Sequence, residues 1–195
     1  MIAAVRGAMR ERLIEAADEL FYAHGMRAVS VDRVIEHART TKVTFYRHFK
    51  SKDDLVVAYL ERRAAQERHG VDAAIAHGAA DPDAALRLIS DALGAITCAP
   101  GFRGCPFINA AAEYAEPDSA VRRIVDAHRE WCRNAFARLV APLDLPDPAA
   151  VAEDLMLLRD GAMVAGYLAD PVRVAASFLR SCRAVIDGSR APAGR

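Results

Sequence analysis

The sequence SVDRVIEHARTTKVTFYRHFKSKDDL, residues 30–55, contains two short helical patterns separated by a turn of three residues. Ser30 before the first pattern and Thr41 before the second are residue types that accept hydrogen bonds from the free amides of a helix N-terminus. Residues 51–54 read SKDD, which fits the capping box that begins a helix. The stretch therefore predicts two short helices followed by a longer one.

The second short helix, Lys42–His48, is predicted to have two different faces. Phe45 and Phe49 provide an apolar face for docking on the preceding helices, whereas the first turn offers smaller or hydrogen-bonding side chains. A helix that enters the major groove of DNA needs such a turn, because bulky apolar groups would clash and find no partner on the base edges. The pattern indicates a helix-turn-helix.

The charge distribution agrees with this interpretation, although the formal net charge is zero. Residues 1–52 contain 10 Lys+Arg and 6 Asp+Glu, a balance of +4, and the remaining residues contain 16 and 20, a balance of −4. The chain has three lysines, Lys42, Lys50 and Lys52, all inside the predicted motif or directly after it. Such an asymmetry favours nucleic-acid binding by the basic part, with an ordinary solvated face as the alternative.

The residues around the motif resemble a known family. Residues 10–25, RERLIEAADELFYAHG, form an amphipathic pattern that ends at Gly25, and they join residues 30–55 in a close resemblance to the DNA-binding domain of TetR family transcriptional regulators. The stretch TKVTFYRHFKSKDDL, residues 41–55, is the most specific part. The C-terminal part resembles the family in architecture alone.

The resemblance implies an all-α fold with two domains of different function. Residues 1–52 are expected to form an N-terminal three-helix DNA-binding domain, and residues 53–188 a larger helical domain for ligand binding and dimerisation. Residues 189–195 are expected to be a flexible tail. The implied function is a sequence-specific regulator, released as a repressor from a palindromic double-stranded DNA operator by a small-molecule effector. The implied homodimer forms through the last two helices.

The expected DNA contacts lie in and beside the motif. Two positions depart from the family pattern: Arg39 stands in the turn where most relatives have glycine, and Val43 replaces a common glycine on the groove-facing side. Either the turn is slightly altered, or Arg39 accepts modest strain at a positive φ and gains a phosphate or base contact; plain structural tolerance of the arginine is the favoured interpretation. Val43 can pack on a thymine methyl group. The predicted DNA-binding residues are Ser30, Arg39, Thr41, Lys42, Val43, Thr44, Tyr46, Arg47, His48 and Lys52.

Helical patterns continue through the rest of the chain. Asp-Pro pairs at 81–82, 147–148 and 170–171 are expected to begin three of these helices, because an acidic N-cap and a proline at the first helical position suit a helix start. The patterns cover 84–96, 106–114, 121–140, 151–168 and 172–186. Gly161, Ala162, Ala165, Gly166 and Ala169, with Phe178, Leu179 and Val185, are expected to form the dimer interface.

The effector site is expected among aromatic, methionine and isolated polar residues of the C-terminal part, each of which has ordinary core packing as its alternative. Glu113, on a predicted helix with three alanines before it, requires a partner if buried: an arginine of this chain or a cationic or hydroxyl-bearing ligand. The predicted effector residues are Phe102, Phe107, Asn109, Glu113, His128, Trp131, Met156, Asp160, Met163 and Tyr167.

A second possible input is a reactive thiol. Cys105 directly precedes the predicted helix 106–114, where the helix dipole favours a thiolate, so a redox- or electrophile-sensing regulator is an alternative; the simpler reading is a small buried hydrophobe. The four cysteines show no C-x-x-C pair and no zinc-finger spacing, so neither a metal nor a cofactor is predicted.

Other classes of protein fit the sequence less well. No H-x-x-x-H, glycine-rich phosphate loop or G-x-S-x-G occurs, so the chain is predicted not to be an enzyme. A helical protein-interaction module without DNA binding would leave the polar recognition segment unexplained. No apolar stretch approaches the roughly 18 to 20 residues of a membrane span, so a soluble, cytoplasmic protein without a membrane partner is expected.

Overall fold

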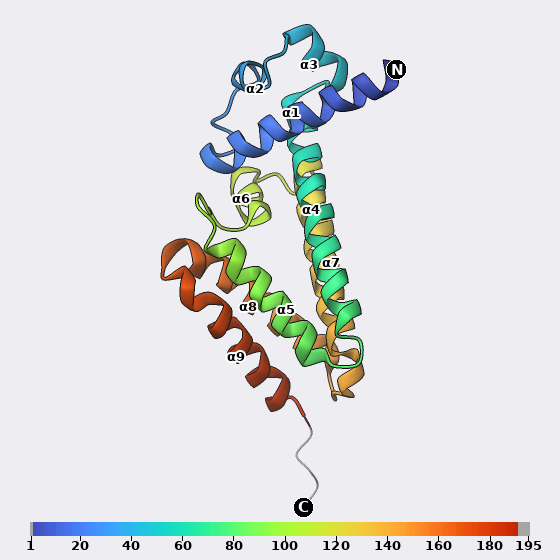
Figure 1. Cartoon of the computed structure of the whole chain (residues 1–195), viewed down its shortest axis with the longest axis vertical. Helices are drawn as coiled ribbons and strands as arrows, with labels where there is room; N and C mark the ends of the chain where they lie inside the picture. The colour runs from blue at the N-terminus through green and yellow to red at the C-terminus, as the bar shows by residue number, and fades with distance from the viewer. Residues whose placement is uncertain (1, 191–195) are drawn as a thin grey trace, which may run out of the picture. The chain divides into compact units, whose positions relative to one another are not determined.

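All regular secondary structure is helical over the residues that the computed structural model describes, 2–190, with side chains described from residue 7. This confirms the predicted fold class. No helix in this range is both long and apolar enough to span a membrane. The α-helices are α1 (Ile2–His24), α2 (Val31–His37), α3 (Lys42–His48), α4 (Lys52–His77), α5 (Pro82–Thr97), α6 (Pro106–Glu113), α7 (Ala120–Val140), α8 (Pro148–Leu168) and α9 (Val174–Gly188), and two 3-10 helices are η1 (Ala141–Leu143) and η2 (Pro171–Arg173) (Figure 1).

The chain divides into two compact units. The first contains residues up to 65 and 106–127, and the second contains 66–105 and 128 onward. The predicted division at residues 52 and 53 follows the DNA-binding motif and therefore differs from these units. Of the predicted tail, 189–195, only Ser189 and Arg190 belong to the described residues, and they directly follow α9.

The first unit is built on a core shared by its short and long helices. The rings of Phe21 in α1 and Tyr59 in α4 meet edge to face at 5.9 Å, and both side chains are buried. The α4 capping box forms as predicted, because the Asp54 amide donates to Ser51 Oγ and the Ser51 amide donates to the Asp54 carboxylate. Further core residues are Leu13, Ala17, Val34, Ile35, Phe45, Phe49, Leu55 and Val56.

The turn between α2 and α3 contains strained backbone at Arg39. Its φ is +47°, the left-handed conformation that favours glycine. Two hydrogen bonds close the end of α2, from the Arg39 amide to the Glu36 carbonyl (2.9 Å) and from the Thr40 amide to the Ile35 carbonyl (3.1 Å). This is the Schellman pattern that ends many helices. The turn therefore keeps the backbone conformation that glycine usually adopts at this position, with arginine in its place.

A side chain of α1 holds the same turn. Arg12 donates from Nε to the Ala38 carbonyl (2.8 Å) and from its terminal nitrogen to the carbonyls of Ala38 and Arg39, the latter at 2.8 Å. These bonds satisfy carbonyl groups that the end of α2 leaves without helical partners. The direction in which α3 leaves the turn is thereby fixed against α1.

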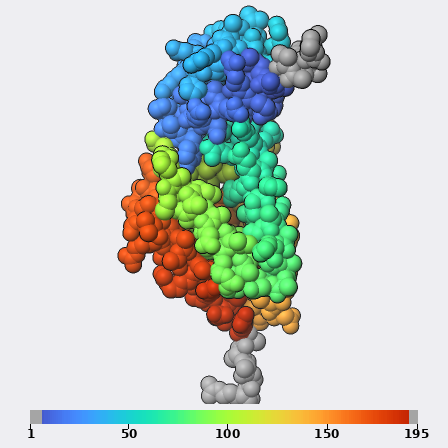
Figure 2. Space-filling model, viewed as in Figure 1, coloured from blue at the N-terminus to red at the C-terminus, as the bar shows by residue number. Residues whose placement is uncertain are grey.

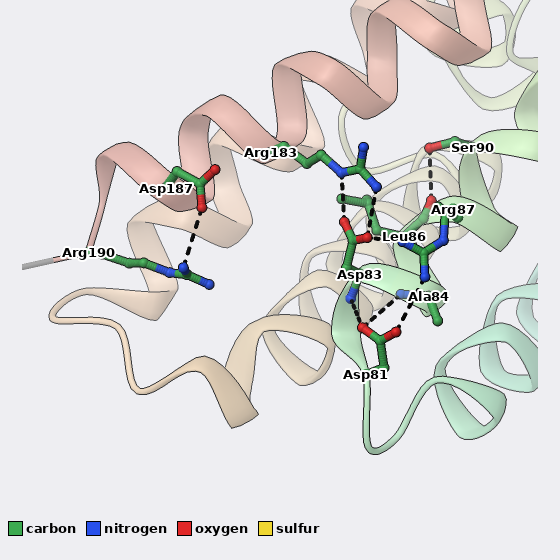
Figure 3. Close-up of polar contacts among 9 residues, drawn as sticks. All are labelled: Asp81, Asp83, Ala84, Leu86, Arg87, Ser90, Arg183, Asp187 and Arg190. Carbon is green, nitrogen blue, oxygen red and sulfur yellow. Dashed lines mark hydrogen bonds and ion pairs between the residues drawn. The ribbon is translucent and has the colours of Figure 1, made fainter.

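The second unit is organised by the packing of α9 on α5 and α8. In Figure 2, the surfaces of α5 and α9 lie side by side. Their close approach requires Gly94, since a Cβ atom added there would lie 2.8 Å from Ala175 Cβ. Figure 3 shows the start of α5, where Asp81 accepts from the amides of Asp83 and Ala84, as the predicted N-cap.

An ion pair ties the start of α5 to α9. Arg183 donates from Nε and a terminal nitrogen to the two carboxylate oxygens of Asp83, each at 2.7 Å (Figure 3). These hydrogen bonds lower the pKa of the Asp83 carboxyl. Asp170 caps η2 rather than an α-helix, and α9 begins at Val174, because the residues after Pro171 form a tighter 3-10 turn.

Part of the predicted dimer interface is core instead. Phe178 and Ala162 are buried inside the second unit, and a Cβ atom at Gly166 would lie 2.5 Å from the Thr97 side chain. These three residues are therefore required for packing between helices of one chain. The exposed apolar residues of α8 include Leu157, Val164 and Leu168, whose spacing of seven and four places them on one face.

The strain at Arg39 predicts the effect of substitution on stability. Arg39→Gly should unfold at a higher temperature than Arg39→Ala, with a free-energy difference of about 1 kcal/mol, because only glycine adopts a positive φ without a steric cost. Comparison with alanine removes the contribution of the arginine side chain. Thermal and urea denaturation measure both variants, and equal stabilities would contradict strain at this residue.

Candidate functional site

The surface of α3 combines buried anchors with exposed polar and apolar side chains. Phe45 is 0% exposed and Phe49 3%, whereas Val43 is 71% exposed and Tyr46 49%. An exposed valine and tyrosine beside basic residues suit contact with base edges and phosphates. The sequence prediction of an inward and an outward face is therefore confirmed for these residues.

Two of the predicted DNA-binding residues, Ser30 and Thr41, also cap the helices that follow them. Thr41 Oγ1 accepts from the Thr44 amide (3.2 Å) and lies 3.0 Å from Thr44 Oγ1. Ser30 Oγ accepts from the Arg33 amide (3.2 Å) at the start of α2. Capping fixes the rotamers of Ser30 and Thr41 and leaves their exposed hydroxyl groups at the ends of the motif helices.

The basic residues of the motif differ in their freedom to move. Lys42 Nζ lies 3.3 Å from Asp32 Oδ1, but both side chains are largely exposed, so this pair is weak. Lys52 is held in place, because its ammonium group donates to the Arg27 carbonyl (3.1 Å). Partial burial lowers the pKa of Lys52. Arg39 and Arg47 are exposed, and His48 is half-buried.

Glu113 has partners that the sequence interpretation did not include. Its carboxylate accepts from the backbone amides of Met26 (3.0 Å) and Arg27 (2.5 Å), and Arg27 Nε donates to the Glu113 carbonyl. Next to it, the Tyr114 hydroxyl donates to Asp53 Oδ1 (3.0 Å), and burial raises the pKa of Tyr114. Glu113 thus links α6 to the loop after α1, and neither a ligand nor an arginine is required to satisfy its carboxylate.

A buried polar cluster lies in the second unit. Arg159, which is buried, donates to Glu67 Oε1 (2.8 Å), Asp160 Oδ1 (3.2 Å) and Cys105 Sγ (3.3 Å). His128 Nε2 lies 3.3 Å from Glu67 Oε2, the second oxygen of the same carboxylate. We name these residues, together with Cys132 and Arg129, the α4–α7–α8 cluster.

Burial and charge act in opposite directions on the titrating groups of this cluster. Burial would raise the pKa of Glu67, but attraction to Arg159 and His128 outweighs it and lowers the pKa to about 2. Burial raises the pKa of the Cys132 thiol to about 12, and the nearby Glu67 charge adds to this shift. At neutral pH Glu67 is therefore ionised, and the Cys132 thiol keeps its proton.

The predicted effector residues separate into two groups. Phe107, Asn109 and Glu113 belong to the first unit, and the other seven belong to the second. His128, Trp131 and Asp160 come together around the cluster: the rings of His128 and Trp131 are 5.8 Å apart, and Asp160 also pairs with Arg129 (2.7 Å). Met156 and Met163 are buried, Tyr167 is exposed, and Phe102 packs near Gly166.

Cys105 is 2% exposed and accepts its hydrogen bond from the Arg159 guanidinium. It immediately precedes α6, as the sequence predicts. The Arg159 guanidinium places a cationic hydrogen-bond donor at the sulfur, but the burial of the sulfur restricts access for a dissolved electrophile. The structure therefore shows that Arg159 is a partner of this thiol, and the sulfur is buried from dissolved electrophiles.

The sequence interpretation missed Glu67, Arg159 and the turn-holding Arg12. One signal was present for Arg159: its spacing of four from Leu155 and Met163 places it on the buried face of α8, where a charge requires partners. No local pattern marks Glu67 or Arg12, because their partners lie far along the chain.

Known proteins share this fold and part of this sequence. The family described as bacterial regulatory proteins, tetR family, matches residues 13–59. The transcriptional regulator AcuR of Cereibacter sphaeroides is 30% identical over 166 residues, which cover 81% of this chain and 76% of AcuR.

Solved structures agree with the sequence matches. A TetR-family transcriptional regulator from Streptomyces coelicolor is 39% identical, with a TM-score of 0.88, covering 94% of this chain and 96% of that one. The regulatory protein TetR from Rhodobacter sphaeroides is 26% identical, with a TM-score of 0.76, covering 88% and 95%. These likenesses in sequence and fold show that the chain belongs to the TetR family of transcriptional regulators.

Proposed function

We propose that this protein is a repressor that binds a palindromic operator as a homodimer and leaves it when a small molecule binds the second unit. The observation that carries the proposal is the exposed surface of α3, with Lys42, Val43, Tyr46 and Arg47 around a buried Phe45. Chromosomal DNA as the partner implies a cytoplasmic protein that acts by binding and not by catalysis. Relatives in the TetR family are DNA-binding regulators.

Each part of the motif has a distinct role in this proposal. Thr44 and Val43 read base edges in the major groove, while Lys42, Tyr46, Arg47 and His48 contact phosphates and set the register. Ser30 and Arg39 lie at the two ends of α2, and Lys52 approaches the backbone from the start of α4. Two recognition helices about 34 to 36 Å apart, or a multiple of this distance, reach successive major grooves of a palindrome.

The dimer is proposed to form through α8 and α9. The exposed stripe of Leu157, Val164 and Leu168 supports this choice, since Gly161 on the same face has no neighbouring atom within 4 Å of an added Cβ. Apolar stripes of this kind favour burial against a second copy of the chain. Ala165, Ala169, Leu179 and Val185 are the remaining candidates from the sequence.

The effector is proposed to bind near His128, Trp131 and Asp160, and Phe102 and Tyr167 remain candidates from the sequence. The signal then passes along α4, which begins at the DNA-binding motif and contributes Glu67 to the α4–α7–α8 cluster. Within the first unit, Glu113 adds a second connection, because α6 is bonded to the loop between α1 and α2. The alternative input, oxidation of Cys105, has support in the Arg159 hydrogen bond alone.

Lys42→Ala should weaken binding to all DNA sequences and reduce its salt dependence. Each phosphate contact contributes about 0.9 to the slope of log affinity against log salt, so the slope should fall by about 1 for each subunit. Fluorescence anisotropy with an operator selected from genomic fragments measures the slope. Arg138→Ala, which removes an exposed charge from α7, should leave the slope unchanged. Equal slopes for Lys42→Ala and the wild type would contradict phosphate contact.

Val43 should make binding sensitive to a thymine methyl group. Replacing the contacted thymine with uracil should weaken binding about fourfold, the effect of losing one buried methyl group of about 0.8 kcal/mol. The same swap should have no effect on Val43→Ala, so the four affinities form a double-mutant cycle. A wild-type affinity that no thymine-to-uracil swap changes would contradict this contact.

Effector binding should be detectable at Trp131, the single tryptophan. Its ring contacts His128 and lies 5.7 Å from the Arg68 guanidinium, so a nearby ligand should change its emission. Compounds that shift the emission should also weaken operator binding by about 5- to 150-fold, the usual range of allosteric coupling. A compound that shifts the emission of Trp131 and strengthens operator binding instead would identify an activator or co-repressor mechanism.

A further inference from the structure

Three side chains of the α4–α7–α8 cluster present metal-binding atoms to one another. Glu67, His128 and Cys132 have their ligand atoms within 4.8 Å. His128 and Cys132 are one helical turn apart on α7, so their side chains lie on the same face. Glu67 comes from α4, and the three side chains therefore join α4 to α7.

Two of the three ligand separations match those of a four-coordinate site, and the third, between Glu67 and Cys132, is within 4.8 Å. His128 Nε2 lies 3.3 Å from Glu67 Oε2 and 3.4 Å from Cys132 Sγ. In a tetrahedral zinc site, bonds of about 2.0 to 2.3 Å place neighbouring ligand atoms about 3.3 to 3.7 Å apart. A cation can therefore bind among these atoms with small side-chain movements.

We propose that Glu67 Oε2, His128 Nε2 and Cys132 Sγ bind one divalent cation of the zinc class. Imidazole and thiolate ligands favour Zn²⁺ and Co²⁺ over Mg²⁺ and Ca²⁺, which prefer oxygen ligands alone. Three protein ligands leave the fourth position for water or another small donor, as in zinc sites that are not purely structural. On binding, the cation replaces the proton of the Cys132 thiol.

Arg159 positions the carboxylate ligand. It donates to Glu67 Oε1, so that the other oxygen, Oε2, faces His128. Such outer hydrogen bonds orient metal ligands in many sites. The positive charge of the Arg159 guanidinium would repel a cation, but the guanidinium also donates to Asp160, which accepts a second hydrogen bond from Arg129. Glu67 and the Cys132 thiolate balance the two charges of the ion.

Burial gives the site a dry interior and one accessible side. The side chain of His128 is 1% exposed, whereas that of Glu67 is 28% exposed. Cys132 is buried as well, and the Trp131 ring lies next to His128. Exclusion of water strengthens ligand bonds to a cation, and the solvent-facing edge of Glu67 provides its entry.

Cobalt titration of the chelator-treated, full-length protein tests the proposal. One Co²⁺ per chain should give the intense visible bands of four-coordinate cobalt together with a thiolate-to-cobalt charge-transfer band in the near ultraviolet. Equimolar Zn²⁺ should remove both bands, and excess Mg²⁺ should not change them. The weak spectrum of six-coordinate cobalt alone would overturn the proposal.

Variants assign the spectrum to residues. Cys132→Ser should abolish the charge-transfer band, and Glu67→Gln should weaken cobalt binding at least tenfold. Cys182→Ser is the matched control, because Cys182 is also buried in the second unit and burial raises its thiol pKa to about 12. This variant should keep the full spectrum. Loss of the band in Cys98→Ser with its retention in Cys132→Ser would overturn the proposal, since Cys98 is exposed.

Two further measurements keep the outcome decisive. If circular dichroism shows that Cys132→Ser is unfolded, zinc X-ray absorption of the loaded wild type replaces it: one sulfur at about 2.3 Å supports the site, and oxygen and nitrogen neighbours alone overturn it. Operator binding is measured on the same preparations without metal. A normal cobalt spectrum with no sequence-specific DNA binding would contradict the proposed function and leave the metal site standing.

Discussion

The DNA-binding surface depends on the burial of Phe45. A helix of seven residues, such as α3, is not stable in water by its own hydrogen bonds. Phe45 is completely buried and packs against Phe49, the residue that follows the helix, so packing supplies the stability that the short helix lacks. Because Phe45 anchors one face, the opposite face can carry Val43, Tyr46 and Arg47 in fixed positions without using them for stability.

The second unit has a corresponding constraint, the buried charge of Arg159. A guanidinium removed from water requires hydrogen-bond acceptors, and α8 alone provides only Asp160. Glu67 from α4 and the sulfur of Cys105 complete the set. This requirement brings residues from distant parts of the sequence to one place and orders His128 and Cys132 around the same carboxylate. Ionisable side chains of the second unit therefore gather around the buried guanidinium of Arg159.

Local signals in the sequence were sufficient for the motif and insufficient for the partners of Glu113. Ser30, Thr41 and Ser51 predicted the helix starts correctly, because capping depends on residues three or four positions away. The partners of Glu113 lie 86 and 87 residues away, and no pattern of spacing indicates them.

The same distinction explains the errors in the C-terminal half. Periodicity placed Phe178, Ala162 and Gly166 on helices, but it could not tell a face that packs inside one chain from a face that packs on a second copy. Both environments are apolar, and both tolerate small residues at close helix contacts. Only the three-dimensional neighbours, Thr97 for Gly166 among them, separate the two cases.

The position of the three lysines has a practical consequence for chemical modification. Lys42 and Lys50 are exposed, and Lys52 carries an ammonium group bonded to the Arg27 carbonyl. The side-chain amines of the chain are thus confined to the DNA-binding motif and its junction with α4. Acetylation or amine-directed cross-linking would neutralise or obstruct this surface while leaving the side chains of the second unit intact. Immobilisation for binding experiments is better directed at the exposed thiol of Cys98.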